Sequence, residues 1–414
     1  MKLKIAQTAK ELDDVFWLRH EVYVLEEGKF GGKPLPESRI IDRFDAFSDN
    51  VSIIAYDGDE PVGTIRVGMD SGLGLATEKY FDLTEYRQAT ADRWMSEQGT
   101  PPIDACASML AVRKQWKNRR DVIRALLKMA IGIWNSWGIT HAYVNVVAET
   151  AKMYARMGFV ELTDWQWLES VGYSVVPIMA RLEDVYQWAF GNLQDPLLES
   201  YSGHFERVLL KPGEILFAEG EPGEHAYMVD EGAIKISRTD LSDRELILST
   251  LEQGDMFGEL ALIDAYPRSA TATALKATEL IVLDRKTFQQ NLSTEPRLID
   301  LVMRNFSKRI RRMDDLAMVL AYGASTQRLH YALQTLRKQA KADVKEPETL
   351  IVKVTPNELA NLAGVCEESA VAYLQSREEL GELTYTHRAI RFLERRTHRC
   401  ESHENPALPP VRPH

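Results

Sequence analysis

Glycines at close intervals punctuate this 414-residue chain from about residue 203 onward. They separate short runs of residues that favour strands, such as Tyr227-Met228-Val229 and Ala233-Ile234-Lys235-Ile236. Regular turn glycines between short strands are typical of a small β-sandwich or jelly roll, which we expect over residues 203–290. The glycines are Gly213, Gly220, Gly223, Gly232, Gly254 and Gly258.

The run from Phe257 to Ala270 carries residues suited to a small cyclic phosphate. Gly258 lets the backbone approach a ligand without a Cβ clash, and free amides at the start of a short helix after it would face the anion. Arg268 can pair phosphate oxygens bidentately, as lysine cannot. Glu259 can accept a hydrogen bond from a ribose hydroxyl, and Ser269 can donate one to phosphate.

These residues resemble the phosphate-binding cassette of cyclic-nucleotide-binding domains. The resemblance implies a cyclic nucleotide as allosteric ligand, with the glutamate on the ribose 2′-hydroxyl and the arginine on the phosphate. We favour cAMP on abundance alone and leave cGMP open, because Leu316 and Ala317 stand where related cAMP-responsive activators have a base-contacting threonine and serine. A relic fold that no longer binds ligand is the alternative. The implied nucleotide-binding residues are Gly258, Glu259, Leu260, Ala261, Arg268 and Ser269.

Apolar residues spaced alternately four and three apart follow in residues 291–322. This heptad seam predicts a long helix that pairs with a second copy of the chain through residues 299–320, giving a homodimer. An amphipathic helix packed on its own domain is the alternative. The seam residues are Ile299, Met303, Phe306, Ile310, Met313, Ala317 and Leu320.

Residues 323–399 resemble the winged helix of the catabolite-activator family, followed by a tail at 400–414. A helix begins at Thr355-Pro356, which supply an N-cap and an N1 proline. Gly364 marks the turn before the expected recognition helix Glu367–Leu380, and Leu383–Phe392 would form the wing.

The expected recognition helix departs from the DNA-binding pattern. Glu367 and Ala372 stand where the family places arginines, and the adjacent Glu367 and Glu368 would repel the DNA backbone. We therefore disfavour DNA as a partner. The degenerate winged helix would instead transmit the state of the sensor or contact the N-terminal domain.

Residues 1–192 alternate strand-like and helix-like patterns, which implies a mixed sheet flanked by helices. Val51–Tyr56 and Pro61–Val67 form a predicted hairpin. Arg120–Trp137 is a predicted helix stopped by Gly138, and His141–Val147 a predicted strand. The stretch Gln194–Ser202 is the expected linker. The whole chain is thus a multidomain α/β and β protein.

The run Ala151-Lys152-Met153-Tyr154-Ala155-Arg156-Met157-Gly158-Phe159 resembles the closing motif of the GNAT acyltransferase superfamily. The resemblance implies that Tyr154 protonates the departing thiolate of a thioester donor as a general acid. A tyrosine simply packed at the end of a helix is the alternative. Asp104 and Glu149 are candidate bases for the attacking amine by position.

Residues 109–120 resemble the superfamily's strand, loop and helix that bind the acyl donor. The resemblance implies a backbone amide that polarises the thioester carbonyl, and loop amides that cradle phosphate. Arg120 and Val122 stand where glycines are expected, so basic side chains would supply charge instead. The implied donor-binding residues are Leu110, Val112, Arg113, Lys117, Arg119 and Arg120.

The runs Phe16–Tyr23, Asp42–Asp45 and Gly63–Arg66 resemble autoinducer synthases and long-chain N-acyl amino acid synthases. The resemblance implies acyl-ACP or acyl-CoA as co-substrate, with the acidic acyl carrier protein as a partner for the basic loop. Cys106 and Met109 replace an expected glutamate and arginine, so acylation of another amine is favoured over homoserine-lactone synthesis. The implied acceptor-binding residues are Arg19, Asp42, Asp45 and Arg66, for which structural ion pairs are the alternative.

Composition limits the remaining classes. The net charge of −11 opposes a protein that coats nucleic acid by bulk attraction. Three distant cysteines without C-x-x-C spacing indicate a reducing cytoplasm and no metal site, and no long apolar run predicts a membrane span. We hypothesise a cyclic-nucleotide-regulated N-acyltransferase acting on an amino acid or related amine. A transcription regulator, a protein lysine acetyltransferase and a scaffold with both sites dead are the alternatives.

Overall fold

The computed structural model describes residues 1–29, 38–169, 172–191, 206–239, 245–264, 266–294, 296–342 and 349–393. These fall into two compact units. The first comprises Met1–Ser237 and Ser249–Ser307, and the second Arg238–Leu248 and Lys308–His414. The expected linker Gln194–Ser202 and the tail 400–414 lie outside the described residues.

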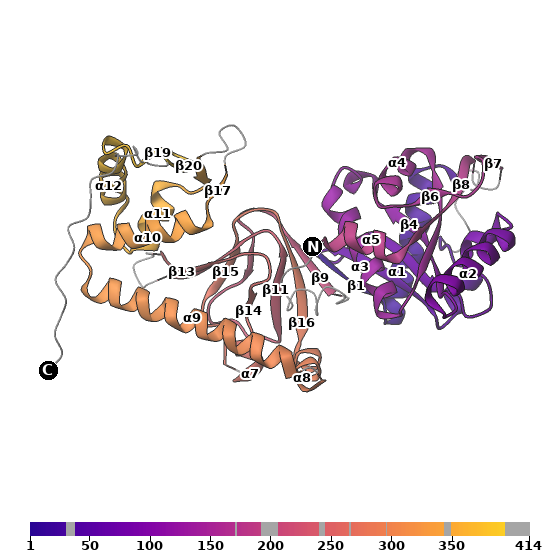
Figure 1. Ribbon diagram of the computed structural model, residues 1–414, viewed down its shortest axis with the longest axis horizontal. Coiled ribbons are helices and arrows are strands. Elements are labelled where there is room, and N and C mark those ends of the chain that lie inside the picture. Colours follow the sequence, from indigo (N-terminus) through magenta and orange to yellow (C-terminus); the bar gives the residue numbers. More distant parts are fainter. Residues whose placement is uncertain are drawn as a thin grey trace, which may run out of the picture. The chain divides into compact units, whose positions relative to one another are not determined.

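The N-terminal part of the first unit is a mixed sheet covered by helices (Figure 1). Its strands pair antiparallel except β4 and β5, which run parallel. The strands are β1 (Lys2–Ile5), β2 (Asn50–Asp57), β3 (Glu60–Met69), β4 (Asp104–Val112), β5 (His141–Val147), β6 (Val160–Glu161), β7 (Gln166–Leu168) and β8 (Tyr173–Arg181).

The helices of this part, with several short 3₁₀ turns, alternate with its strands. They are α1 (Ala9–His20), which continues into the π-helical turn η1 (Glu21–Glu26), then α2 (Thr84–Gln98), α3 (Arg120–Ser136), α4 (Ala148–Arg156) and α5 (Leu182–Phe190). The 3₁₀ turns are η3 (Arg43–Ala46), η4 (Ala76–Lys79) and η5 (Lys114–Trp116).

Helix α3 forms because apolar residues recur every three or four positions. Val122, Leu126, Met129 and Ile133 are all buried in the core between α3, α5 and the sheet. Burying each such side chain stabilises the fold by roughly 1.5–3 kcal/mol. The predicted hairpin β2–β3, the helix α3 and the strand β5 are confirmed, and Gly138 has the expected positive φ of 69° after α3.

The glycine-punctuated stretch folds into short strands in two sheets, as expected. The second sheet has the order β10-β15-β12-β13, and the other strands join the N-terminal sheet. The strands are β9 (Glu206–Leu210), β10 (Ile215–Phe217), β11 (His225–Glu231), β12 (Ile234–Thr239), β13 (Glu245–Leu251), β14 (Met256–Phe257), β15 (Thr271–Ala274) and β16 (Thr278–Asp284). Their helices are α7 (Leu260–Ile263), α8 (Arg285–Thr294) and the long α9 (Pro296–Tyr322).

The two parts of the first unit share one twelve-stranded sheet (Figure 1). Its order is β14-β11-β16-β9-β1-β2-β3-β4-β5-β8-β6, with β7 on β8. Strand β9 pairs antiparallel with both β16 and β1, with Val208 opposite Leu280 on one side and Lys2 on the other. Backbone hydrogen bonds therefore run without interruption from one part to the other.

Most of the predicted seam on α9 faces solvent in the single chain. Ile299, Met303, Ile310 and Met313 are 45%, 51%, 58% and 56% exposed. Phe306 instead packs partly against the core beside β11 and β16. The side chains of Leu316 and Leu320 lie outside the described part of the chain.

The second unit packs three helices on a four-stranded sheet of order β17-β18-β20-β19. Thr355 caps α11 with a reciprocal capping box, Pro356 is its first residue, and Gly364 ends it in the left-handed conformation. The predicted helix boundaries are confirmed here. The elements are α10 (Ser325–Gln339), α11 (Pro356–Ala363), α12 (Glu367–Glu379), β17 (Lys341–Ala342), β18 (Leu350–Val352), β19 (Leu383–Thr386) and β20 (Ala389–Phe392). Among the described helices of the chain, none is long and apolar enough to cross a membrane.

Candidate functional site

Strands β4 and β5 pair only over their first halves and then separate. Their register covers Asp104–Ala107 against His141–Val144, although both strands continue further. A pocket of about 190 Å³ lies where they part. Its lining is Tyr23, Lys29, Asp42, Arg66, Ala76, Thr77, Lys79, Tyr80, Ala107, Ser108, Met109, Asn145, Val147, Leu168, Tyr173 and Val175.

A β-bulge in β4 borders this pocket. Arg66 of β3 pairs with Ser108 and Thr64 pairs with Ala111, so Met109 and Leu110 together oppose one residue. Met109 has φ of 56°, which non-glycine residues seldom adopt in a strand. The bulge turns backbone amide groups out of the sheet's ladder at the edge of the pocket.

The predicted acceptor residues meet as a group of four charges in which both arginines are buried. Arg19 Nη1 lies 2.9 Å from Asp45 Oδ1, and Arg66 Nη1 lies 2.6 Å from Asp42 Oδ1 and 3.0 Å from Asp45 Oδ1. Burial raises the pKa of Asp42, but hydrogen bonds and charge from Arg66 hold it below its usual value. Both arginines are thus compensated by carboxylates, as the ion-pair alternative requires. Of the four, Asp42 and Arg66 line the pocket.

Tyr154 lies in α4 and is buried, with its ring edge-on to Phe159 at a centroid distance of 5.4 Å. Burial raises the pKa of Tyr154 to about 12. Its phenol therefore keeps its proton at neutral pH, which a general acid needs.

Neither candidate base lines the pocket, and Tyr154 does not line it either. Asp104 begins β4 and accepts a hydrogen bond from Arg87 Nε at 2.9 Å. Burial raises the pKa of Asp104, partly offset by the charge of Arg87. Glu149 is exposed in the first turn of α4. Among the described lining residues, Asp42 is the one carboxylate.

Three of the four predicted basic residues in the loop between β4 and α3 are paired with acidic neighbours. Arg113 Nε lies 2.9 Å from Glu26 and Lys117 Nζ lies 2.5 Å from Glu27. Arg119 pairs at 2.5 Å with Asp121, whereas Arg120 is exposed at the first residue of α3. Of the remaining predicted donor residues, Leu110 is the second residue of the bulge in β4 and Val112 ends that strand.

The predicted nucleotide cassette is assembled around Arg268. Its Nη1 donates to the Gly258 carbonyl and its Nη2 to the His225 carbonyl, both at 2.8 Å. The guanidinium also lies 4.1 Å from the centroid of the Phe217 ring. A Cβ on Gly223 would come within 2.6 Å of the Ala261 Cβ, and one on Gly258 within 2.8 Å of Arg268 Nη1 at a φ of 74°, so both positions favour glycine.

The other cassette residues flank this arginine. Glu259 and Ala261 are buried, while Leu260 is 41% exposed and Ser269 is exposed. Gly258 has φ of 74° immediately before α7. The cassette therefore presents both a buried carboxylate and a buried guanidinium, the pair that a ribose and a phosphate require.

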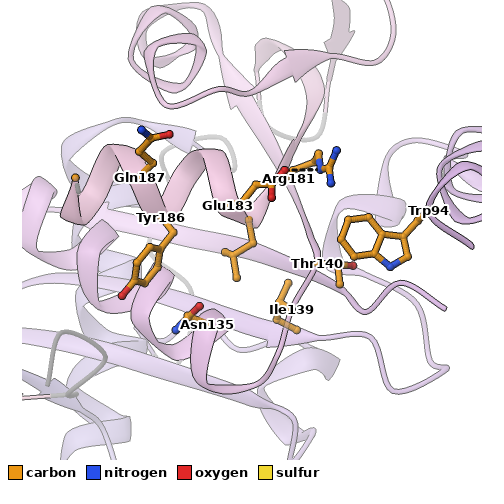
Figure 2. Close-up of a pocket in the computed structure, with 10 residues that line it drawn as sticks. Trp94, Asn135, Ile139, Thr140, Arg181, Glu183, Tyr186 and Gln187 are labelled. Atoms are coloured by element: carbon orange, nitrogen blue, oxygen red, sulfur yellow. Dashed lines mark ion pairs between the residues drawn. The ribbon is translucent and has the colours of Figure 1, made fainter. Parts of the chain in front are cut away.

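A larger pocket of about 490 Å³ lies elsewhere in the N-terminal part (Figure 2). Figure 2 shows Trp94 at one end and Tyr186 at the other, with an ion pair of 2.9 Å between Arg181 and Glu183. None of the predicted site residues lines it. Volume alone therefore does not make it the reaction site.

The part of the chain that the structure describes also holds no cluster of three His, Cys, Asp or Glu side chains placed for a metal.

Sequence reasoning missed a buried ion cluster where α3 meets the strands of the nucleotide cassette's sheet. Lys128 Nζ lies 2.7 Å from Asp230 and 3.3 Å from Glu279, and Arg207 Nη1 lies 2.6 Å from each carboxylate. All four side chains are buried. The available signal was a lysine within the apolar run Leu126-Leu127-Lys128-Met129 of α3.

The charges of this cluster balance. Burial raises the pKa of Asp230, but Arg207 and Lys128 more than offset this and lower it. Two cations therefore face two anions in a place without water access, where loss of any one leaves an uncompensated charge.

Comparison with known proteins divides the chain in the same way. Residues 14–181 match the family model of N-acyl amino acid synthase FeeM, and residues 207–295 match the cyclic nucleotide-binding domain. The Cyclic AMP receptor protein of Thermus thermophilus is 30% identical over 178 residues, covering 43% of this chain and 79% of the relative. A CRP-like cAMP-activated global transcriptional regulator of Mycobacterium tuberculosis is 28% identical over 182 residues, covering 44% of this chain and 80% of the relative.

A solved structure, that of the c-di-GMP responsive global regulator CLP from Xanthomonas campestris, is similar to part of this chain. It is 25% identical with a TM-score of 0.40, and the match covers 45% of this chain and 93% of that one.

Proposed function

Because residues 14–181 of the chain belong to the N-acyl amino acid synthase family and its C-terminal part to the cyclic AMP receptor protein family, we propose that this N-acyltransferase is switched by a cyclic nucleotide. The observation that carries the proposal is the junction between the two parts. They share a sheet through β1 and β9 and a buried ion cluster around Lys128. A change at the nucleotide cassette thus has a packed route to the acyltransferase.

The reaction is transfer of an acyl group from a thioester, acyl-ACP or acyl-CoA, to the amine of an amino acid or related molecule. The amine nitrogen attacks the thioester carbonyl, a C–N bond forms and the C–S bond breaks. The nitrogen loses one proton to solvent water, and Tyr154 donates one to the departing sulfur. Tyr154 then regains its proton from solvent, so the net change is the transfer of one proton from nitrogen to sulfur. A backbone amide of the bulge at Met109 polarises the carbonyl.

Charge at the pocket supports an acceptor that carries both an amine and an anionic group. Asp42 keeps its negative charge because Arg66 lowers its pKa, so it suits an acceptor's ammonium group. Lys29 and Lys79 also line the pocket and suit a carboxylate. Arg120, the exposed cation at the end of the loop, suits a phosphate of CoA or the acidic surface of an acyl carrier protein.

Strand β11 supports a route for the nucleotide signal. Its first residue, His225, accepts a hydrogen bond from Arg268, and Asp230 near its other end accepts one from Lys128 of α3. A nucleotide phosphate that takes Arg268 away from the His225 carbonyl would shift one end of this strand. The ion cluster passes that shift to α3, whose first residue follows the donor-binding loop.

The exposed seam of α9 supports a homodimer in which two copies pair along residues 299–320. Glu367 and Glu368 are exposed in the first turn of α12. Their charge opposes binding of DNA phosphates, so we propose the N-acyltransferase rather than a transcription regulator as the chain's function.

The test is an assay of thiol release from acyl-ACP and acyl-CoA of several chain lengths, with amino acids and other amines as acceptors. Each reaction is run with and without cAMP and cGMP, and products are identified by mass spectrometry. We expect an N-acylated amine whose rate of formation depends on nucleotide, and an Arg268→Ala variant that forms it without that dependence. Absence of thiol release for all pairs would contradict the proposal, as would a rate that ignores bound nucleotide.

A further inference from the structure

Tyr23 connects the N-terminal helix to the bulge that borders the pocket. It lies in η1, where α1 widens into a π-helical turn over Glu21–Glu26. Such turns are rare and are often found at functional sites. The Tyr23 hydroxyl donates a hydrogen bond to the Leu110 carbonyl oxygen at 2.9 Å, and its side chain lines the pocket.

The carbonyl that Tyr23 binds belongs to the second residue of the bulge. Met109, the first residue, holds a positive φ that a methionine does not adopt readily, and such a conformation persists only where its surroundings fix it. Leu110 lies outside the ladder, since β3 pairs with Ser108 before it and Ala111 after it. A hydrogen bond from outside the sheet therefore fixes the peptide plane there.

The hydroxyl of Tyr23 is itself held in place. Burial, with the nearby charge of Glu27, raises the pKa of Tyr23, so the group stays a donor at neutral pH. The ammonium of Lys29 lies 4.4 Å from the centroid of the Tyr23 ring and 4.9 Å from that of Tyr173. The Tyr23 ring thus packs against the Lys29 ammonium while its hydroxyl reaches the Leu110 carbonyl.

We propose that Tyr23 is a positioning residue, whose hydrogen bond to the Leu110 carbonyl holds the bulge so that a backbone amide polarises the thioester carbonyl. This inference rests on the proposed acyl transfer and adds a residue to it. Tyr23 acts through the backbone of the bulge and takes no proton from substrate.

The matched variants are Tyr23→Phe and Tyr56→Phe. Each variant removes one tyrosine hydroxyl from the N-terminal part. Tyr56→Phe is the control, because the Tyr56 hydroxyl donates to Asp14 at 2.8 Å and Tyr56 does not line the pocket. Both are made in the full-length chain, and cyclic nucleotide binding and thermal unfolding confirm that they fold.

Two readouts separate positioning from a general structural role. The first is hydrogen–deuterium exchange of the segment Asp104–Val112 without substrate. The second compares the change in kcat with the change in affinity for an S-alkyl CoA thioether, a donor analogue that lacks the thioester carbonyl. We expect Tyr23→Phe to speed exchange in this segment and lower kcat roughly tenfold to a hundredfold, the range that a small misplacement of a reacting group produces. Its thioether affinity and the behaviour of Tyr56→Phe stay as in the unmodified protein.

The inference is overturned if exchange of the segment is unchanged in Tyr23→Phe, or if kcat falls no further than in Tyr56→Phe. A loss of thioether affinity that matches the loss of kcat would also overturn it. If the unmodified protein releases no thiol from any donor, the proposed function fails. The exchange measurement then still decides whether Tyr23 tethers the bulge.

Discussion

Replacing Lys128 by methionine removes one charge from the buried cluster at the junction. The remaining cluster has one cation, Arg207, against two anions, Asp230 and Glu279, and water does not reach them. Breaking a buried ion pair by removing one partner costs about 3–5 kcal/mol. We expect Lys128→Met to lower the free energy of unfolding by about this amount. It also removes the hydrogen bond from Lys128 of α3 to Asp230, to which we assign the nucleotide signal.

A second variant separates lost stability from lost coupling. Lys128→Met combined with Glu279→Gln removes one charge of each sign, which leaves Arg207 facing Asp230 in a neutral cluster. We expect this double variant to recover part of the stability but not the Lys128–Asp230 hydrogen bond. Lys10→Met is the control, since Lys10 pairs with Asp14 on the surface at 3.0 Å and such pairs contribute little.

The assays are urea unfolding and the acyl-transfer rate with and without saturating cyclic nucleotide. A coupling of about 1–3 kcal/mol would give a nucleotide effect of about 5- to 150-fold in the unmodified protein. We expect an effect near one in both Lys128 variants and an unchanged effect in Lys10→Met. A double variant that is stable and keeps the full nucleotide effect would refute the role of the cluster.

The remaining predictions concern single sites. Tyr154→Phe should lower kcat with little effect on donor binding. In the unmodified protein, burial raises the pKa of Tyr154 to about 12, so ionisation of Tyr154 should not reduce the rate below about pH 11 in a pH profile. Gly258→Ala should weaken nucleotide binding in calorimetry at least tenfold, since its Cβ would meet Arg268 at 2.8 Å at a φ of 74°; unchanged affinity would contradict this. Met303→Glu with Ile310→Glu should convert a dimer to a monomer in analytical ultracentrifugation, whereas a dimer that persists would place the contact elsewhere.

Local signals were enough to predict many elements from the sequence. The turn residues of the β2–β3 hairpin, the apolar period of α3 and the capping residues of α11 each act within a few positions, so their structures follow from neighbouring residues. The cassette residues around Arg268 are close in sequence as well, and the structure brings them together.

Long-range pairing could not be predicted in the same way. Strand β9 joins β1 across about two hundred residues, and nothing in either short strand specifies its partner. The contacts of Arg19 and Arg66 depend on where η3 places Asp42 and Asp45, so charge type alone could not separate an acceptor site from ion pairs. Tyr23 reaches Leu110 because of a π-helical turn, which has no simple sequence signature.

Reciprocal titration measures the coupling between nucleotide binding and acyl-donor binding, on which the proposed regulation of acyl transfer depends. The affinity for the acyl donor is measured with and without cyclic nucleotide, and the affinity for the nucleotide with and without a non-reactive donor analogue. Linkage requires the same factor in both directions, about 5- to 150-fold for a typical coupling. If neither affinity changes when the other ligand is bound, the proposed coupling between the two sites is contradicted.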